Sequence, residues 1–180
     1  MNRQLLWDCH MHSSFSSDSS TPMENMIRRS IELGLKGITF TEHLDPDYPA
    51  TPDGLDFSLD IPAYREKLQK LQDTYRDQIQ VRFGIELGLQ MHLRDYFYSL
   101  LAETPFDFII GSSHLVHGYD PYYPEFFEGR KEFYCYMEYF ESILENISVY
   151  DGFDVYGHID YVVRYGPEKN RQYSYGRYKD

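Results

Sequence analysis

The stretch GITFTEH, residues 37–43, decides the fold class. It starts at a glycine, continues through the β-branched and aromatic residues typical of a strand, and ends in a glutamate and a histidine. Three later stretches repeat this design of an apolar run with a polar end, at residues 79–86, 108–114 and 153–158. An opening strand from Leu5 to His12 brings the number of predicted strands to five.

The segments between these strands have the 3.6-residue periodicity of helices. The first helix opens at a capping box in which Thr21 is the N-cap, Pro22 the first helical position and Glu24 the third. Gly34 ends it. The apolar positions of this helix are Met23, Met26, Ile27 and Ile31; a second helix is entered at Asp60-Ile61-Pro62 and carries Tyr64, Leu68, Leu71 and Tyr75; a third passes through Leu93, Phe97 and Leu100; a fourth runs from about Lys131 to Ile147.

Strand alternates with helix five times and no low-complexity linker interrupts the alternation. The sequence therefore predicts one α/β domain over residues 1–180, with a parallel sheet closed or partly closed into a barrel. An open doubly wound sheet is the alternative. The barrel is favoured because residues of metal-ligand type end every strand, and a barrel brings all strand ends to one mouth.

Composition narrows the functional classes. A net charge of -12 argues against binding to nucleic acid or to an anionic membrane, since both require a basic face. Cys9 and Cys135 form neither a disulfide framework nor a C-x-x-C pair, which favours a reducing cytoplasm. Residues 1–6 lack the apolar core of a signal peptide, and no apolar run approaches the ~20 residues of a membrane span.

The polar strand ends share one chemistry. Imidazole and carboxylate bind zinc, iron and manganese, and so many at one mouth exceed what a single tetrahedral ion can use. A lone histidine at a strand end is more often a satisfied polar residue, but structural reasons alone would not repeat the pattern five times. The sequence thus predicts a multinuclear metal site formed by His10, His12, His43, Glu86, His114 and His158, with Asp8, Asp18 and Asp160 as further carboxylates.

The remaining histidines are less informative. His92 lies at a predicted helix start and is interpreted as a solvent-facing or capping residue. His117 lies in a loop that also contains Tyr119, Tyr122 and Tyr123, where contact with substrate and simple exposure are equally good interpretations.

The motifs at these positions resemble those of the polymerase-and-histidinol-phosphatase (PHP) superfamily. DCHMH (residues 8–12), FSSD (15–18) and FTEH (40–43) are similar to its opening motifs. FGIE (83–86), GSSH (111–114) and YGHID (156–160) look like the next three, and the match spans nearly the whole chain in order. Residues 111–117 and 157–166 look most like the stand-alone histidinol-phosphatases of histidine biosynthesis.

The resemblance implies a distorted (β/α)7 barrel with up to three divalent metals, zinc, iron or manganese. His10, His12 and Glu86 would hold one metal, Glu86 with His114 and His158 a second, and Asp18 with His43 the third. Family members add a C-terminal Gly-Ser-Asp-x-His segment that is absent here, and a full barrel has ~250 residues. We therefore expect a C-terminally incomplete barrel, either a truncated relative or a fragment, whose unpaired edges are compatible with a homo-oligomer.

The implied reaction is metal-assisted hydrolysis of a small phosphate ester, histidinol phosphate first. Arg164 is the candidate for binding the phosphate, with a solvated helix-end charge as the alternative, and Asp160 or His117 is the candidate proton donor. A PHP phosphoesterase acting on another monoester or a nucleic-acid 3' end, and a non-catalytic metal-binding domain, remain as alternatives.

Overall fold

A computed structural model describes residues 6–168, 171 and 173–179. In this part of the chain, five parallel strands form one sheet in the order β1-β2-β3-β4-β5. The strands are β1 (Trp7–Asp8), β2 (Gly37–Leu44), β3 (Gln80–Gly88), β4 (Phe108–Ser112) and β5 (Val155–Tyr156). Strand order follows chain order without the reversal that defines a doubly wound sheet, so that alternative is wrong.

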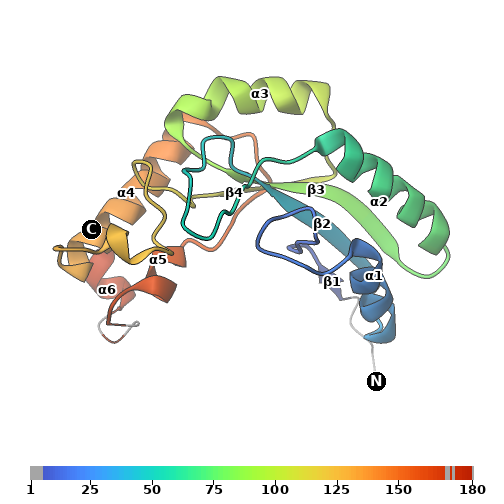
Figure 1. Cartoon of the computed structure of the whole chain (residues 1–180), viewed down its shortest axis with the longest axis horizontal. Helices are drawn as coiled ribbons and strands as arrows, with labels where there is room; N and C mark the ends of the chain where they lie inside the picture. Colours follow the sequence, from blue (N-terminus) through green and yellow to red (C-terminus); the bar gives the residue numbers. More distant parts are fainter. Residues whose placement is uncertain (1–5, 169–170, 172, 180) are drawn as a thin grey trace.

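The helices that connect consecutive strands follow one another along the outer side of this sheet, and the whole has the shape of an arch (Figure 1). The predicted α/β class is confirmed, as a curled parallel sheet that forms a half-barrel. The helices are α1 (Met23–Glu32), α2 (Ile61–Tyr75), α3 (Arg94–Glu103), α4 (Glu132–Val149), α5 (Tyr161–Tyr165) and α6 (Tyr175–Tyr178), with 3-10 turns η1 (Met91–Leu93) and η2 (Pro124–Phe126).

Helix α2 shows how the sequence forms these elements. Asp60 is its N-cap and accepts a hydrogen bond from the Ala63 backbone N–H, and all four residues of its predicted stripe are buried. The hydroxyl of Tyr64 lies 2.9 Å from the backbone oxygens of both Phe40 and Gly84. This side chain therefore ties the helix to β2 and β3 at once.

Helix α1 corrects one prediction. Its N-cap is Pro22 rather than Thr21, and no side chain caps it. Glu24 turns outward instead, where it accepts hydrogen bonds from Arg28 and from the hydroxyl of Tyr75. The predicted end is confirmed, because Gly34 has φ 77°, a left-handed conformation that glycine adopts without strain.

Several strands end at residues other than those predicted. The first strand was expected from Leu5 to His12; Leu5 lies outside the described residues, and the chain leaves the sheet after Asp8. β4 and β5 stop before His114 and His158, which places both histidines on connecting segments. β3, by contrast, continues two residues past Glu86, so that this glutamate is held inside the sheet.

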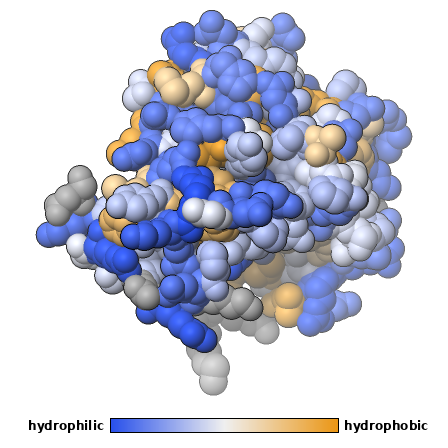
Figure 2. Space-filling model, turned by 60° about the vertical axis from the view of Figure 1, so that its left-hand side comes forward, coloured by the Kyte–Doolittle hydropathy of each residue, from blue (hydrophilic) through white to orange (hydrophobic). Residues whose placement is uncertain are grey.

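The core consists of three apolar clusters, one beneath α1 and α2, one beneath α3, and one between α4 and α5. Hydrophilic residues cover most of the face shown in Figure 2, and its hydrophobic residues form small separate patches. None of the helices in the described residues combines the length and hydrophobicity required to span a bilayer.

Candidate metal centre

Two neighbouring strands place the first two functional side chains. His43 on β2 is in register with Glu86 on β3, and paired residues of adjacent strands project to the same face. Glu42, one residue earlier on β2, projects to the opposite face. Because side chains alternate between the two faces of β2, His43 and Glu42 contact different sets of residues.

Glu42 fixes the loop that follows β1. It is fully buried and accepts hydrogen bonds from the Ser13 backbone N–H at 3.0 Å and from the hydroxyls of Ser13 and Ser16 at 2.5 and 2.6 Å. The Ser16 hydroxyl in turn accepts from the backbone N–H of His43. These contacts hold residues 13–16 against β2, between His12 on one side and Asp18 on the other.

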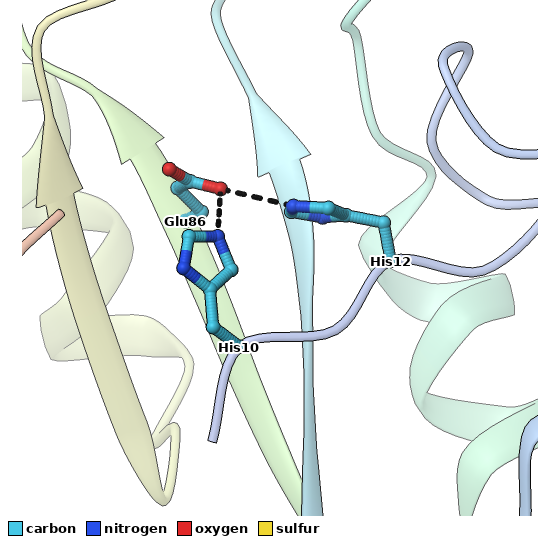
Figure 3. Close-up of side chains that lie close together, drawn as sticks. All are labelled: His10, His12 and Glu86. Carbon is cyan, nitrogen blue, oxygen red and sulfur yellow. Dashed lines mark hydrogen bonds and ion pairs between the residues drawn. The ribbon is translucent and has the colours of Figure 1, made fainter. Parts of the chain in front are cut away.

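Glu86 is the centre of a histidine cluster. Its Oε2 lies 2.8 Å from His10 Nε2 and 3.2 Å from His12 Nε2. Figure 3 shows both histidines pointing toward this carboxylate. Its Oε1 lies 3.2 Å from His114 Nε2 and 3.1 Å from His158 Nε2. His10 and His12 come from the loop after β1, whereas His114 and His158 follow β4 and β5. The structure thus brings the segments after three strands, β1, β4 and β5, to one carboxylate on β3.

The electrostatics of Glu86 require positive charge beside it. The side chain has no exposed surface, and burial opposes its ionisation. Hydrogen bonds from His10, His114, His12 and His158 nevertheless hold the pKa of Glu86 well below its usual value. A buried carboxylate surrounded by imidazoles is stabilised either by protons on those imidazoles or by a metal cation.

The donor set fits divalent metals. His10, His12 and Glu86 offer ligand atoms within 4.8 Å of one another, and so do His43, Glu86 and His114. Ligand atoms around a tetrahedral ion with bonds of about 2.1 Å are separated by about 3.4 Å, close to the spacing around Glu86. Because both groups share Glu86, its two oxygens can serve two ions.

Asp18 pairs with His43, which also belongs to the ligand group of Glu86 and His114. His43 Nε2 lies 3.5 Å from Asp18 Oδ2. Burial raises the pKa of the Asp18 carboxyl. The hydrogen bond and the charge of His43 act in the opposite direction, and together the contacts of Asp18 hold its pKa below the usual value. Asp18 therefore offers a charged oxygen beside the ligand group of His43, Glu86 and His114.

The cluster forms one part of the wall of a pocket of about 830 Å³. Arg164 on α5 also lines it, as do Asp120, Tyr48 and Tyr161. Burial raises the pKa of Asp120, which accepts hydrogen bonds from the Tyr48 and Tyr161 hydroxyls at 2.5 and 2.9 Å. The pocket thus joins a histidine-rich region, a cation and an aromatic wall with a buried acid.

Several sequence candidates lie away from this pocket. Asp160 is exposed and is the N-cap of α5, and the His117 ring bonds Glu138 on α4 at 3.0 Å. Neither lines the pocket. Asp8 accepts a hydrogen bond from the His10 backbone N–H instead of joining the ligand atoms. His92 is 59% exposed and pairs with Asp47, as its interpretation as a solvent-facing residue predicted.

Asp45, Asp120 and the anchoring role of Glu42 were not predicted from the sequence. Asp45 is buried, lines the pocket and accepts a hydrogen bond from His114 Nδ1 at 2.8 Å. Its position two residues beyond His43 was the available signal, because alternate residues at a strand end share a face. No comparable periodicity marks Asp120, which lies in an irregular loop.

Comparison with known families shows that the PHP domain matches residues 8–180 of this chain. The chain belongs to the PHP domain family.

Two curated relatives extend this assignment. The PHP domain is 31% identical over 174 residues to a histidinol-phosphatase of Lactococcus lactis, covering 96% of this chain and 63% of the relative. It is 30% identical over 176 residues to a probable histidinol-phosphatase of Clostridium acetobutylicum, covering 98% and 66%. The chain thus spans a little less than two thirds of the length of these relatives.

Solved structures agree with the fold. The crystal structure of the L. lactis histidinol phosphate phosphatase, complexed with zinc, L-histidinol and phosphate, superposes on this PHP domain with a TM-score of 0.90 at 30% identity. The overlap covers 98% of this chain and 66% of that one. A putative histidinol phosphatase from Listeria monocytogenes gives a TM-score of 0.80 at 18% identity over 97% and 75% of the two chains, which supports the fold alone.

Proposed function

We propose that this PHP domain takes part in the metal-dependent hydrolysis of a phosphate monoester, with histidinol phosphate as the substrate. The observation that carries the proposal is the buried Glu86 carboxylate with four imidazole nitrogens within 3.2 Å, at the edge of a pocket that also contains an arginine. The similarity to a histidinol phosphatase whose structure contains zinc, L-histidinol and phosphate supports the metal and the substrate.

We assign the metal ligands as the resemblance to the PHP superfamily implies. His10, His12 and Glu86 would hold one ion, and Glu86 with His114 and His158 a second. Asp18 and His43 would hold the third. Bound divalent ions lower the pKa of a coordinated water and neutralise phosphoryl oxygens. Zinc is the metal that the relative supports, and iron and manganese suit the same imidazole and carboxylate ligands.

Arg164, which also lines the pocket, would bind the phosphate. Its guanidinium is exposed, stacks at 5.9 Å over the Tyr165 ring and carries a charge that matches phosphate oxygens. Arg164→Ala is expected to lower kcat/KM by about 10- to 100-fold, mainly through KM, because it removes a charge-assisted contact. Arg164→Lys should restore part of it. Unchanged kinetics in Arg164→Ala would exclude this role.

We assign no proton-donor role to Asp160 or His117, because neither side chain lines the pocket. The two alternatives to histidinol phosphate hydrolysis, another ester and a non-catalytic metal-binding domain, differ from it in measurable ways.

The test combines metal content with phosphate release. The protein would be loaded with zinc, manganese or iron(II), and metal content and phosphate release would be measured with histidinol phosphate, other monoesters and a 3'-phosphorylated oligonucleotide. Metal binding with release from histidinol phosphate supports the proposal. Release from other esters alone, or metal binding without release, would favour the alternatives. His12→Ala should abolish release, whereas His92→Ala, which changes an exposed histidine paired with Asp47, should not.

A further inference from the structure

Asp45 lies between two of the proposed metal ligands. It follows β2 directly and is only 3% exposed. Its Oδ1 lies 2.8 Å from His114 Nδ1, and its Oδ2 lies 3.7 Å from His43 Nδ1. A single carboxylate therefore faces the same ring nitrogen of two histidines that belong to different proposed metal positions.

The other ring nitrogen of each histidine faces a proposed metal ligand. His114 Nε2 lies 3.2 Å from Glu86 Oε1, and His43 Nε2 lies 3.5 Å from Asp18 Oδ2. A metal-binding imidazole must offer an unprotonated nitrogen, so its proton has to be on the other nitrogen. Both rings meet this requirement when Nδ1 carries the proton and Asp45 accepts it.

The hydrogen bond between His43 Nδ1 and Asp45 Oδ2 is not formed in this structure, and both atoms are buried. Among the described residues, His43 Nδ1 and Asp45 Oδ2 have no hydrogen-bond partner, although each is shielded from solvent. Glu86 Oε2 is as close to His43 Nδ1, at 3.6 Å, but it already contacts His10 and His12. Asp45 Oδ2, 3.7 Å from His43 Nδ1, is therefore the nearby acceptor that no other donor occupies in the described part of the chain.

The neighbouring strand leaves room for the carboxylate. Gly88 lies on β3 opposite Asp45, and a Cβ atom at Gly88 would overlap Asp45 Oδ1. The Asp45 backbone N–H donates to the Phe57 oxygen at 3.0 Å, which fixes the residue from the other side. The site thus combines a glycine that admits the carboxylate with a backbone contact that orients it.

We propose that Asp45 is a positioning residue that accepts the Nδ1 protons of both His43 and His114 and so presents both Nε2 atoms to metal. The inference rests on the proposed metal centre. It adds that a residue outside the ligand set couples two metal positions, because one carboxylate sets the tautomer and orientation of a ligand in each. Partners of this kind typically change metal affinity 10- to 100-fold.

Asp45→Asn tests the coupling in the full chain. An amide of the same shape accepts at its oxygen and donates at its nitrogen, so only one of the two histidines keeps an acceptor opposite its Nδ1. Zinc titration followed by dialysis and elemental analysis is expected to show a 10- to 100-fold loss of affinity and fewer bound ions than in the wild type. Asp47→Asn is the matched control, because it breaks an aspartate–histidine pair of the same chemistry at the exposed His92 and should leave zinc binding unchanged.

A second measurement needs no variant of Asp45. In ¹⁵N spectra of the zinc-loaded wild type, His43 and His114 should both show the Nδ1–H tautomer. Gly88→Ala, which displaces the carboxylate while keeping its charge, should weaken zinc binding as Asp45→Asn does, and this covers the case in which Asp45→Asn does not fold.

The outcomes separate the two proposals. If the wild type binds no zinc, the proposed metal centre is wrong and the role of Asp45 falls with it. If the wild type binds zinc and Asp45→Asn or Gly88→Ala binds it with the same affinity and stoichiometry, only the role of Asp45 is overturned. Nε2–H tautomers at His43 and His114 would also overturn it.

Discussion

At the scale of single residues, the centre of this PHP domain depends on one fully buried carboxylate. Glu86 has imidazole nitrogens on both of its oxygens and also accepts a hydrogen bond from the Ser112 hydroxyl at 2.6 Å. A buried charge is tolerated only with such partners, since removing it from water costs several kcal/mol. The same feature makes Glu86 suited to binding two cations at once.

Glu86→Gln is expected to remove at least one metal ion per chain and to weaken the others by about 100-fold. The amide has the same shape but lacks the charge and one acceptor oxygen, and both of the ligand groups that share Glu86 lose a ligand. Zinc stoichiometry and affinity are the measurements. Glu66→Gln, which changes an exposed glutamate on α2, is the control. Full zinc binding by Glu86→Gln would contradict the proposed centre.

At the scale of elements, β2 has a different function on each of its faces. His43 projects toward the ligands, and Glu42 anchors the loop that contains His12 and Asp18. Helix α2 covers the same region of the sheet, where Tyr64 contacts the backbone of both β2 and β3. The geometry of the candidate site is therefore set by contacts outside the ligand set.

Glu42→Gln is expected to loosen residues 13–18. The Ser13 backbone N–H lies 3.0–3.1 Å from both carboxylate oxygens, so either orientation of an amide places an NH₂ group against a donor. We expect a loss of about 1–3 kcal/mol in unfolding free energy and faster amide exchange in this loop. Hydrogen exchange and denaturant unfolding would measure these effects. Glu24→Gln on the surface of α1 should show neither, and a protected loop in Glu42→Gln would refute the anchoring role.

Tyr64→Phe tests the tie between helix and sheet. Loss of the hydroxyl removes the hydrogen bond to two buried carbonyl oxygens without creating a large cavity, and should cost about 1–2 kcal/mol of unfolding free energy. Denaturant unfolding would measure it. The control is Tyr75→Phe, at the last stripe position of α2. Its hydroxyl bonds the partly exposed Glu24, so its loss should cost less than about 1 kcal/mol. Equal costs for the two variants would contradict the tie.

At the scale of the whole molecule, the candidate metal ligands come from β3 and from the segments after β1, β4 and β5. His10, Glu86, His114 and His158 are far apart in sequence, and a metal bound among them would connect the loop after β1 to the segment after β5. Any ligand that binds only the folded state stabilises it by mass action. Metal binding and global stability should therefore be linked in this chain.

Metal removal is expected to lower the melting temperature. At a free zinc concentration 100 times Kd, one site contributes about 2.7 kcal/mol. For a chain of 180 residues this corresponds to about 5–10 °C. Calorimetric scans with zinc, after chelation, and after zinc is added back would measure the shift. The same melting temperature in all three states would show that metal does not bridge the folded strands.

The sequence by itself determined the strand and helix order and the ligand types. Apolar runs with polar ends predicted the parallel sheet, and the recurrence of histidine and glutamate at those ends predicted the donor set that the structure brings together. Both are local patterns, because strand period and residue chemistry are written in neighbouring positions. The predicted capping box of Thr21 and Glu24 shows the limit of local patterns. Glu24 accepts hydrogen bonds from the distant Tyr75 and from Arg28 instead of capping the helix.

Only the tertiary structure decided which candidates meet. Sheet register placed Glu86 opposite His43 and made it the partner of histidines up to 76 residues away. The path of the loops directed His117 toward Glu138, left Asp160 exposed and brought Asp45 and Asp120 to the pocket. The physical reason is that loop direction and the curl of the sheet depend on contacts between residues far apart in sequence, which no local pattern records.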